Sequence, residues 1–345
     1  MNFNLKKILF SFCILSLITL GLISIQGNVS FKKIELMPKM QAIGPLQIKN
    51  NDEFEGWATY LGWLGNGTKD DPYIIEDEVF DGNSYLCLLI WETTVYFIIR
   101  NCEFINSNGH DAVSLRRIQN GKLINNVISD DQYNGFDLSY SSNFVISENT
   151  ITNSGHLGIE ISYSTNITLS DNVLNNNGYG GLQISSSSNI LCKNNTASNN
   201  VKGFDIQKIN TTKIIQNTMK NNTNEGIYAL ECNQTEILEN AINENVWGIR
   251  LSSSINNTIS ENIINSNNQY GIYLSGANYT LIKDNNLLGN GKCIYEYNCE
   301  GNIFEDNVCK KGSSTTISGY YIYIIIGIIF LTSLIVLQKK YKYRS

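Results

Sequence analysis

Two acidic stretches of this sequence have the residue types that acid–base chemistry needs. Asp130 and Asp131 are adjacent, and His110 and Asp111 precede them by about one unit of the repeat described below. Corresponding corners of successive repeat units stack, so these groups are expected to lie close together. Paired carboxyl groups at a suitable separation hydrolyse glycosides, and a like-charge pair raises one pKa. An ordinary polar turn is the alternative interpretation.

A second set of residues has the chemistry of binding. The motif Gly-apolar-x-apolar recurs along the chain, and its x position is expected to point outward from a strand. Tyrosine faces stack on sugar rings, while carboxylates and amides hydrogen-bond hydroxyls, so an elongated polysaccharide could lie along this row. An ordinary solvated strand face is the alternative. The row consists of Asp137, Glu160, Gln183, Asp205, Tyr228, Arg250 and Tyr273.

A repeat supplies the elements that position both sets. The Gly-apolar-x-apolar motif recurs at a nearly constant interval from Gly135 to Gly271. A second pattern, Asn-x-apolar, keeps the same interval, and two interlocked periods of this kind indicate a solenoid. The second pattern occurs at Asn126, Asn149, Asn172, Asn195, Asn217, Asn240, Asn262, Asn285 and Asn307.

Each repeat unit carries three short segments in which apolar and polar residues alternate, for example 158–161, 167–169 and 172–174. Alternation is typical of strands, and the joints are rich in Asn, Gly and Ser, which tolerate turns. The sequence therefore predicts an all-β fold, a parallel β-helix of about ten coils over residues 74–310. The crossover rule predicts right-handed winding. A leucine-rich solenoid has a similar period, but its helix-like segments do not match this composition.

Stacked coils are expected to bury columns of isoleucine and to align the nine asparagines as a ladder of side-chain amides. Stacked carboxylates would repel one another, which explains Asn at these positions. Cys192 is expected to be a buried thiol, and a disulfide among Cys293, Cys299 and Cys309 would fix the last coil. The chain has 2 His and no CxxC motif, so we expect no metal site and no cofactor.

Two apolar segments flank the repeat. Lys6 and Lys7 precede the first, so residues 1–27 are expected to be a signal peptide or signal anchor. Residues 28–73 lack the period and are expected to cap the first coil. A linker at 311–319 leads to an apolar run at 320–338 that suits one membrane crossing, followed by a basic tail at 339–345 on the cytoplasmic side. A buried core helix is the alternative for the last apolar run.

These flanks predict a β-helix that lies outside the cell membrane and is held there by one or two membrane passes. The membrane is thus one expected partner, and polysaccharide or another cell-surface component is a second. The net charge is −6 and the pI is about 5.1, so no basic surface for nucleic acid is expected.

The segment 248–264 is similar to the parallel β-helix repeat known as PbH1, and 65–75 is similar to the lead-in of NosD-like right-handed β-helix proteins. The resemblance covers roughly residues 65–310 and implies the fold. The family name implies copper handling, but His110, His156 and Met219 are isolated, whereas copper sites need clustered His, Met or Cys.

We therefore expect a membrane-anchored surface module that binds polysaccharide or serves a structural role, with no catalytic residue. The alternative is a carbohydrate-active enzyme, either a polysaccharide lyase or a glycoside hydrolase. Its site would lie near His110, Asp111, Asp130, Asp131 and Asp137.

Overall fold

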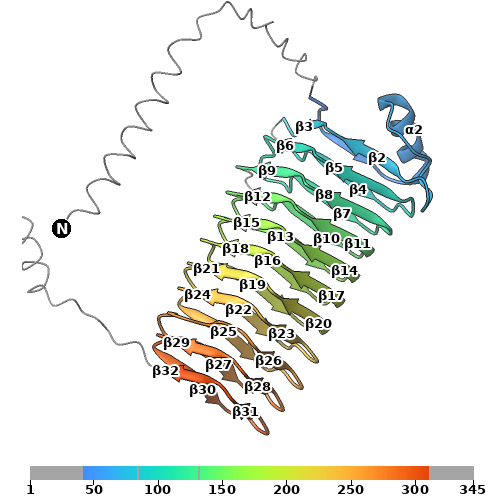
Figure 1. Ribbon diagram of the computed structural model, residues 1–345. Coiled ribbons are helices and arrows are strands. Elements are labelled where there is room, and N and C mark those ends of the chain that lie inside the picture. Colours follow the sequence, from blue (N-terminus) through green and yellow to red (C-terminus); the bar gives the residue numbers. More distant parts are fainter. Residues whose placement is uncertain (1–41, 84, 131–132, 311–345) are drawn as a thin grey trace, which may run out of the picture. The chain divides into compact units, whose positions relative to one another are not determined.

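The computed structural model describes residues 42–83, 85–130 and 133–310 of the chain. These residues form a stack of short strands with flat faces, and one helix, α2 (Asn51–Leu61), follows the first strand (Figure 1). The expected segments at 1–27 and 311–345, part of the expected cap, and Asp131 lie outside the described residues. Within those residues, no helix is both long enough and apolar enough to cross a membrane.

The strands form two sheets of 11 strands, one of 8 and one of 2. Sheet 1 contains β1 (Leu46–Ile48), β4 (Leu88–Trp91), β7 (Val113–Arg116), β10 (Phe136–Ser139), β13 (Leu157–Ser162), β16 (Gly180–Ser185), β19 (Lys202–Gln207), β22 (Glu225–Leu230), β25 (Trp247–Ser252), β27 (Tyr270–Ser275) and β30 (Lys292–Tyr297). Sheet 2 contains β2 (Tyr73–Glu76), β5 (Phe97–Arg100), β8 (Gly121–Ile124), β11 (Ser142–Ser147), β14 (Thr165–Ser170), β17 (Ser188–Lys193), β20 (Asn210–Ile215), β23 (Glu236–Leu238), β26 (Thr258–Ser260), β28 (Leu281–Lys283) and β31 (Ile303–Glu305).

The third face is split. Its larger part, sheet 3, contains β3 (Val79–Asp81), β6 (Glu103–Ile105), β9 (Val127–Ser129), β12 (Thr150–Thr152), β15 (Val173–Asn175), β18 (Thr196–Ser198), β21 (Thr218–Lys220) and β24 (Ala241–Asn243). Single bridges through Ile263 continue this face to a pair of strands, β29 (Asn286–Leu288) and β32 (Val308–Lys310).

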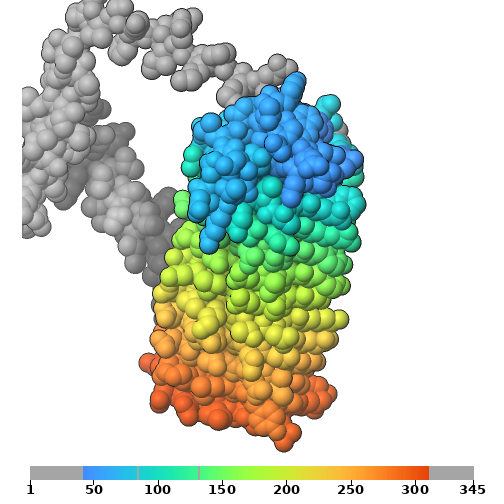
Figure 2. Space-filling model, turned by 90° about the vertical axis from the view of Figure 1, so that its right-hand side faces the viewer, coloured from blue at the N-terminus to red at the C-terminus, as the bar shows by residue number. Residues whose placement is uncertain are grey.

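Each strand pairs in parallel with the strand one coil later, so equivalent residues stack directly. In sheet 1, Phe136 pairs with Ile159, which pairs with Leu182. All three are fully buried, because the apolar side of one coil is covered only by the coils above and below it. The coils follow one another as regular rows (Figure 2). The predicted all-β parallel solenoid of about ten coils is confirmed for the described residues.

Buried asparagines connect the coils at one corner. The Nδ2 of Asn172 donates to Oδ1 of Asn195 (2.8 Å) and to the backbone oxygen of Ile146 (2.8 Å). The backbone N–H of Asn172 donates to the same Oδ1 (3.0 Å). This pattern repeats from Asn126 to Asn307. Each amide therefore accepts from a backbone N–H of the preceding coil, donates to a backbone carbonyl of that coil, and donates to the side-chain amide of the following coil. A carboxylate could not do this because it has no donor.

A second ladder of buried asparagines connects the coils, and it was not predicted from the sequence. The backbone N–H of Asn222 donates to Oδ1 of Asn245 (2.9 Å), and its Nδ2 donates to the same atom (3.0 Å). The members of this ladder recur once per repeat unit, which was a visible signal in the sequence. The ladder contains Asn177, Asn200, Asn222, Asn245, Asn267 and Asn290.

Helix α2 covers the first coil. The Asn50 side chain accepts a hydrogen bond from the N–H of Glu53 (2.8 Å), and Gly62 ends the helix in the left-handed region. Phe54 is fully buried, and its ring lies 5.1 Å from that of Tyr73 and 5.3 Å from that of Phe97. The segment assigned to the cap from its lack of period also contains β1, which is the first strand of sheet 1.

The cysteines follow the sequence expectation where the structure describes them. Cys192 is fully buried, as predicted. The predicted disulfide at the last coil joins Cys293 to Cys309, while Cys299 remains a partly exposed thiol. The bond links β30 to β32 across the interior of the last coil.

The ladder can be tested at its centre. Replacing Asn195→Asp removes the donors to Leu169 and Asn217 and buries a negative charge in their place. We expect the free energy of unfolding to fall by about 3 kcal/mol or more, measured by urea denaturation. The control Asn199→Asp adds the same charge at an exposed corner position and should change stability by under about 0.5 kcal/mol. Equal effects of the two substitutions would contradict the ladder's role.

Candidate functional site

The outward positions of sheet 1 form one continuous row. Strand pairing places each residue beside the next, about 4.8 Å apart. The seven residues expected from the sequence are brought together in the expected order. The register extends the row by Gln47, Leu89 and Ser114 at the N-terminal end and by Tyr295 at the C-terminal end. The full row is Gln47, Leu89, Ser114, Asp137, Glu160, Gln183, Asp205, Tyr228, Arg250, Tyr273 and Tyr295.

Aromatic side chains gather at the C-terminal end of this row. Trp247, Tyr270, Tyr273 and Tyr295, here called the aromatic platform, come from β25, β27 and β30. The ring centroids of Trp247 and Tyr273 lie 4.6 Å apart, and those of Tyr273 and Tyr295 lie 5.5 Å apart in a stacked arrangement. All four side chains are partly exposed, so their rings are packed in place but remain accessible.

Cations are interleaved with the aromatic platform. The Arg250 guanidinium lies 4.7 Å from the ring of Trp247, and Lys292 Nζ lies 4.9 Å from the ring of Tyr295. Such contacts hold the cations over the ring faces. Arg250 also donates to the buried Glu225 (3.3 Å). Trp247 and Tyr270 occupy the position before the glycine of the Gly-apolar-x-apolar motif, and this position was not among the residues predicted from the sequence to bind a ligand.

The centre of the row is occupied by a buried ion pair. Asp205 is fully buried, although its position faces outward. Lys202 covers it, with Nζ 2.7 Å from Asp205 Oδ2, and the hydroxyl of Tyr179 donates to the same oxygen (3.2 Å). Burial lowers the pKa of Lys202, but the hydrogen bonds to Asp205 and Tyr179 outweigh this and raise it. Asp205 therefore positions Lys202 and is not available to a ligand, contrary to the sequence expectation.

Acidic residues gather at the N-terminal end of the row. Asp111 lines a cleft of about 370 Å³, here called the acidic cleft, and the carboxyl groups of Asp137 and Glu160 are close enough to Asp111 to interact with it electrostatically. Its lining residues include Asp111 and Ser114, together with Tyr85, Trp91, His110, Arg116 and Tyr133. Ser114 Oγ donates to Asp137 Oδ2 (3.2 Å), and Asn134 Nδ2 donates to Glu160 Oε2 (2.9 Å). Three carboxyl groups from neighbouring coils thus lie beside one cleft.

The surroundings of these carboxyl groups favour their protonated forms. Burial, followed by the charge of Glu160, raises the pKa of Asp111 to about 6. Burial, followed by the charges of Asp111 and Glu160, raises the pKa of Asp137 to about 7. Groups that gain or lose a proton near neutral pH are suited to general acid–base work.

The structure regroups the acid–base residues expected from the sequence. His110 and Asp111 line the acidic cleft, and Asp137 lies beside it. Asp130 is directed elsewhere: it occupies a left-handed corner position, where its carboxylate accepts from Asn153 (3.1 Å). Asp131 lies outside the described residues. Asp130 is thus not among the residues that line the acidic cleft with His110 and Asp111.

A column of three stacked rings near the acidic cleft was not predicted from the sequence. Nδ1 of His156 lies 3.0 Å from Oδ1 of Asn134, which links the imidazole to the partner of Glu160. The His156 ring stacks between those of Tyr133 (5.3 Å) and Tyr179 (5.1 Å). These three rings recur once per repeat unit, and that regularity could have identified the column. In the described residues, no group of three or more His, Cys, Asp or Glu side chains could hold a metal ion.

The raised pKa values predict how stability depends on pH. The folded-state pKa of Asp137 lies above its unfolded value of about 4, so the folded state binds this proton more tightly than the unfolded state. The resulting stabilisation is fully present below about pH 4. This contribution is lost as pH rises through about 7. The free energy of unfolding should therefore fall between pH 5 and pH 8.5.

Urea titrations across this range test the effect. Asp137→Asn should remove ~2 kcal/mol or more of the decline and should raise stability at pH 8.5. Glu261→Gln, which removes a carboxylate from an exposed corner, is the matched control. If both variants show the wild-type decline, Asp137 does not carry it.

Comparisons with known proteins support the fold. A search of curated protein sequences finds no match. The periplasmic alginate epimerase AlgG superposes with a TM-score of 0.56 and 15% identity, over 78% of this chain and 85% of that chain. A double mutant of AlgG gives a TM-score of 0.61 and 16% identity, over 68% of this chain and 69% of that one. The A-module of the Azotobacter vinelandii mannuronan C-5 epimerase AlgE6 gives a TM-score of 0.50 and 14% identity, over 69% of this chain and 81% of that chain.

At these identities the solved structures establish a shared fold alone. The family described as right handed beta helix region matches residues 86–242 and 206–327, which is more than half of the chain. This match includes the strands of the row from β4 onward and all four residues of the aromatic platform. The chain belongs to the right-handed β-helix family.

Proposed function

We propose that the outward face of sheet 1 binds a polysaccharide. The observation that carries this proposal is the aromatic platform, in which four partly exposed rings lie side by side on three successive coils. Aromatic rings offer flat apolar faces to sugar rings, and the polar groups beside them can hydrogen-bond sugar hydroxyls. The straight row of outward positions suits an extended polymer better than a compact ligand.

The rest of the face is consistent with an extended ligand. Gln183 and Glu160 continue the row with partly exposed hydrogen-bonding groups, and Tyr228 lies between Lys202 and Arg250. The similar solved structures include enzymes whose names refer to alginate and mannuronan, both polysaccharides. These names support the class of ligand proposed for this chain without identifying it.

The proposal includes a location at the cell surface. Residues 1–27 act as a signal peptide or signal anchor, residues 320–338 cross the membrane, and the β-helix lies outside the cell. The lead-in at 65–75 and the PbH1-like repeat favour a place among NosD-like proteins within the broader family. Protease digestion of intact cells tests this topology, because only an external β-helix would be cleaved or released.

Binding can be tested on the aromatic platform. The double substitution Trp247→Ala and Tyr273→Ala should weaken binding about 10-fold or more, since each stacked ring contributes ~1 kcal/mol. Affinity electrophoresis against a panel of neutral and acidic polysaccharides provides the measurement. The control is Tyr140→Ala with Tyr163→Ala, which removes an exposed stacked pair at another corner. Equal retention of all three proteins would refute binding at the platform.

A second candidate function is catalysis on a bound polysaccharide, and the acidic cleft favours it. Protonated Asp137 could donate a proton to a glycosidic oxygen. An ionised carboxylate such as Glu160 could remove a proton from the attacking water. A longer corner supports this site. The core residues on its two sides, Phe104 and Val113, are one residue further apart in the chain than Ile128 and Phe136, which flank the equivalent corner of the next coil. His110 lies in the longer corner and lines the cleft.

This second candidate predicts a product. Incubation with pectic and other uronate polymers should release reducing ends or unsaturated sugars, and Asp137→Asn should lower the rate at least ~100-fold. Asp130→Asn should leave the rate within about twofold, because Asp130 does not line the cleft. Binding without any product would assign the face to binding alone.

A further inference from the structure

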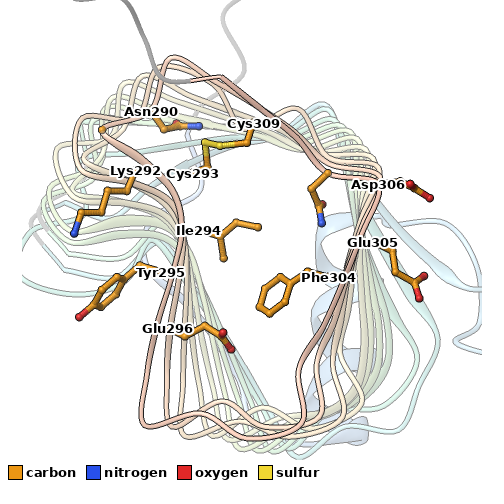
Figure 3. A pocket seen from close by; sticks show the side chains of 12 residues that line it. Asn290, Lys292, Cys293, Ile294, Tyr295, Glu296, Phe304, Glu305, Asp306 and Cys309 are labelled. Atoms are coloured by element: carbon orange, nitrogen blue, oxygen red, sulfur yellow. A yellow bond between two sulfur atoms is a disulfide. The ribbon is translucent and has the colours of Figure 1, made fainter.

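Among residues 42–83, 85–130 and 133–310, none covers the apolar interior of the β-helix at its last coil. Ile294, Phe304 and Cys309 end three columns of core residues and line a hollow of about 1000 Å³ (Figure 3). Phe304 is 41% exposed, whereas its partner one coil earlier, Ile282, is fully buried. Open sheet edges also leave backbone groups unpaired. At the opposite end α2 covers the first coil, so the two ends differ sharply.

The chain itself continues directly from this open end. Strand β32 ends at Lys310, and residues 311–345 follow. The core column of sheet 1 passes from Ile249 to Ile272 and then to Ile294, advancing by one repeat unit each time. A step from Ile294 equal to that from Ile249 to Ile272 reaches Ile317. The sequence therefore places an isoleucine one repeat interval beyond Ile294.

The corner before Ile317 also has a suitable length. The step from Cys309 to Ile317 equals the step from Ile264 to Ile272 across the equivalent corner. Independently, the match to the right-handed β-helix family runs to residue 327, well past Lys310 at the end of β32. Both observations favour a segment of this chain as the occupant of the open end.

We propose that residues 315–318 add one more parallel strand to the edge of β30 and that Ile317 covers Ile294. In this register Ser318 faces outward beside Tyr295, and Gly319 lies beside Glu296. Glu296 is the register partner of Leu274, so the second core column of sheet 1 has already become polar there. The coil then ends because no apolar residue continues that column. The segment assigned to a linker in the sequence, 311–319, becomes part of the solenoid and its C-terminal cap.

Hydrogen exchange on the full-length protein in detergent tests this proposal. The substitution Ile317→Asp should speed exchange of amides in β30 by ~10-fold or more, because the covering strand is lost. Ser318→Asp places the same charge at an outward position of the same strand and should change exchange less than about twofold. Peptides from β13 and β16 report whether the remaining coils stay folded, since distant coils of a solenoid are only weakly coupled.

Unchanged exchange of β30 in the Ile317→Asp variant would overturn the proposal. A second measurement identifies the occupant. Cysteines at Tyr295→Cys and Ser318→Cys should form a disulfide within one chain on mild oxidation, because adjacent strands lie about 4.8 Å apart. The pair Tyr273→Cys and Ser318→Cys is two strands apart, beyond the reach of a disulfide, and serves as the control.

Intact mass and non-reducing gels distinguish the possible results. A disulfide within one chain for the first pair alone supports the proposed strand. Disulfides between two chains would show that a second copy covers the open end, and the absence of any disulfide would show that residues 315–318 do not lie there. Either of these two results overturns the proposal. Tyr295 belongs both to the aromatic platform and to the lining of the hollow, but the binding test changes Trp247 and Tyr273, which do not line the hollow. A glycan-binding result therefore does not bear on this proposal.

Discussion

The structure depends on satisfying the backbone polar groups that the coils bury at their corners. A buried N–H or C=O without a partner costs free energy comparable to a lost hydrogen bond, and this cost recurs in every coil. Asn195 shows the solution: its amide accepts from the coil before it and donates to the coil after it and to the carbonyl of Leu169. Asparagine suits this role because it carries both a donor and an acceptor on a short side chain. The two ladders, of nine and six residues, account for 15 of the 49 asparagines in the chain.

The ladders also limit what the surface can become. An amide reaches the next coil only if each coil returns to the same register, so long insertions within the coils are unfavourable. The functional surface is therefore made from side chains on a flat sheet, with small departures at a few corners. The longer corner between Phe104 and Val113 is such a departure, and His110 and Asp111 on it line the acidic cleft. Chemistry on this fold depends on which side chains stack along a column.

The two buried aspartates of the row show how neighbours decide the role of a residue. Asp205 lies beside Lys202 and Tyr179, so its charge is compensated by an ion pair at 2.7 Å. Asp137 is buried beside Asp111 and Glu160, and its pKa rises to about 7. The same residue type at the same motif position thus becomes a positioning group in one coil and a proton-binding group in another. This contrast separates the central ion pair from the acidic cleft and leaves the aromatic platform as the accessible apolar part of the face.

Much of the fold was determined by the sequence alone. Residues one repeat interval apart in the chain stack directly on one another in the structure. One regular period therefore predicts the strands, the core columns and the ladder from Asn126 to Asn307. The same period placed the outward row in its correct order. Cap residues such as Phe54 could not be found this way because they do not repeat.

Tertiary structure decided which members of the row are accessible and which acidic groups meet. Exposure depends on the length and direction of neighbouring side chains: Lys202 covers Asp205, although the motif places Asp205 on the outer face. Corner direction depends on backbone conformation: Asp130 adopts a left-handed conformation and contacts Asn153, while the charge of Glu160 acts on Asp111. A sequence period fixes register along the solenoid, but lateral contacts between columns depend on side-chain packing that the period does not encode.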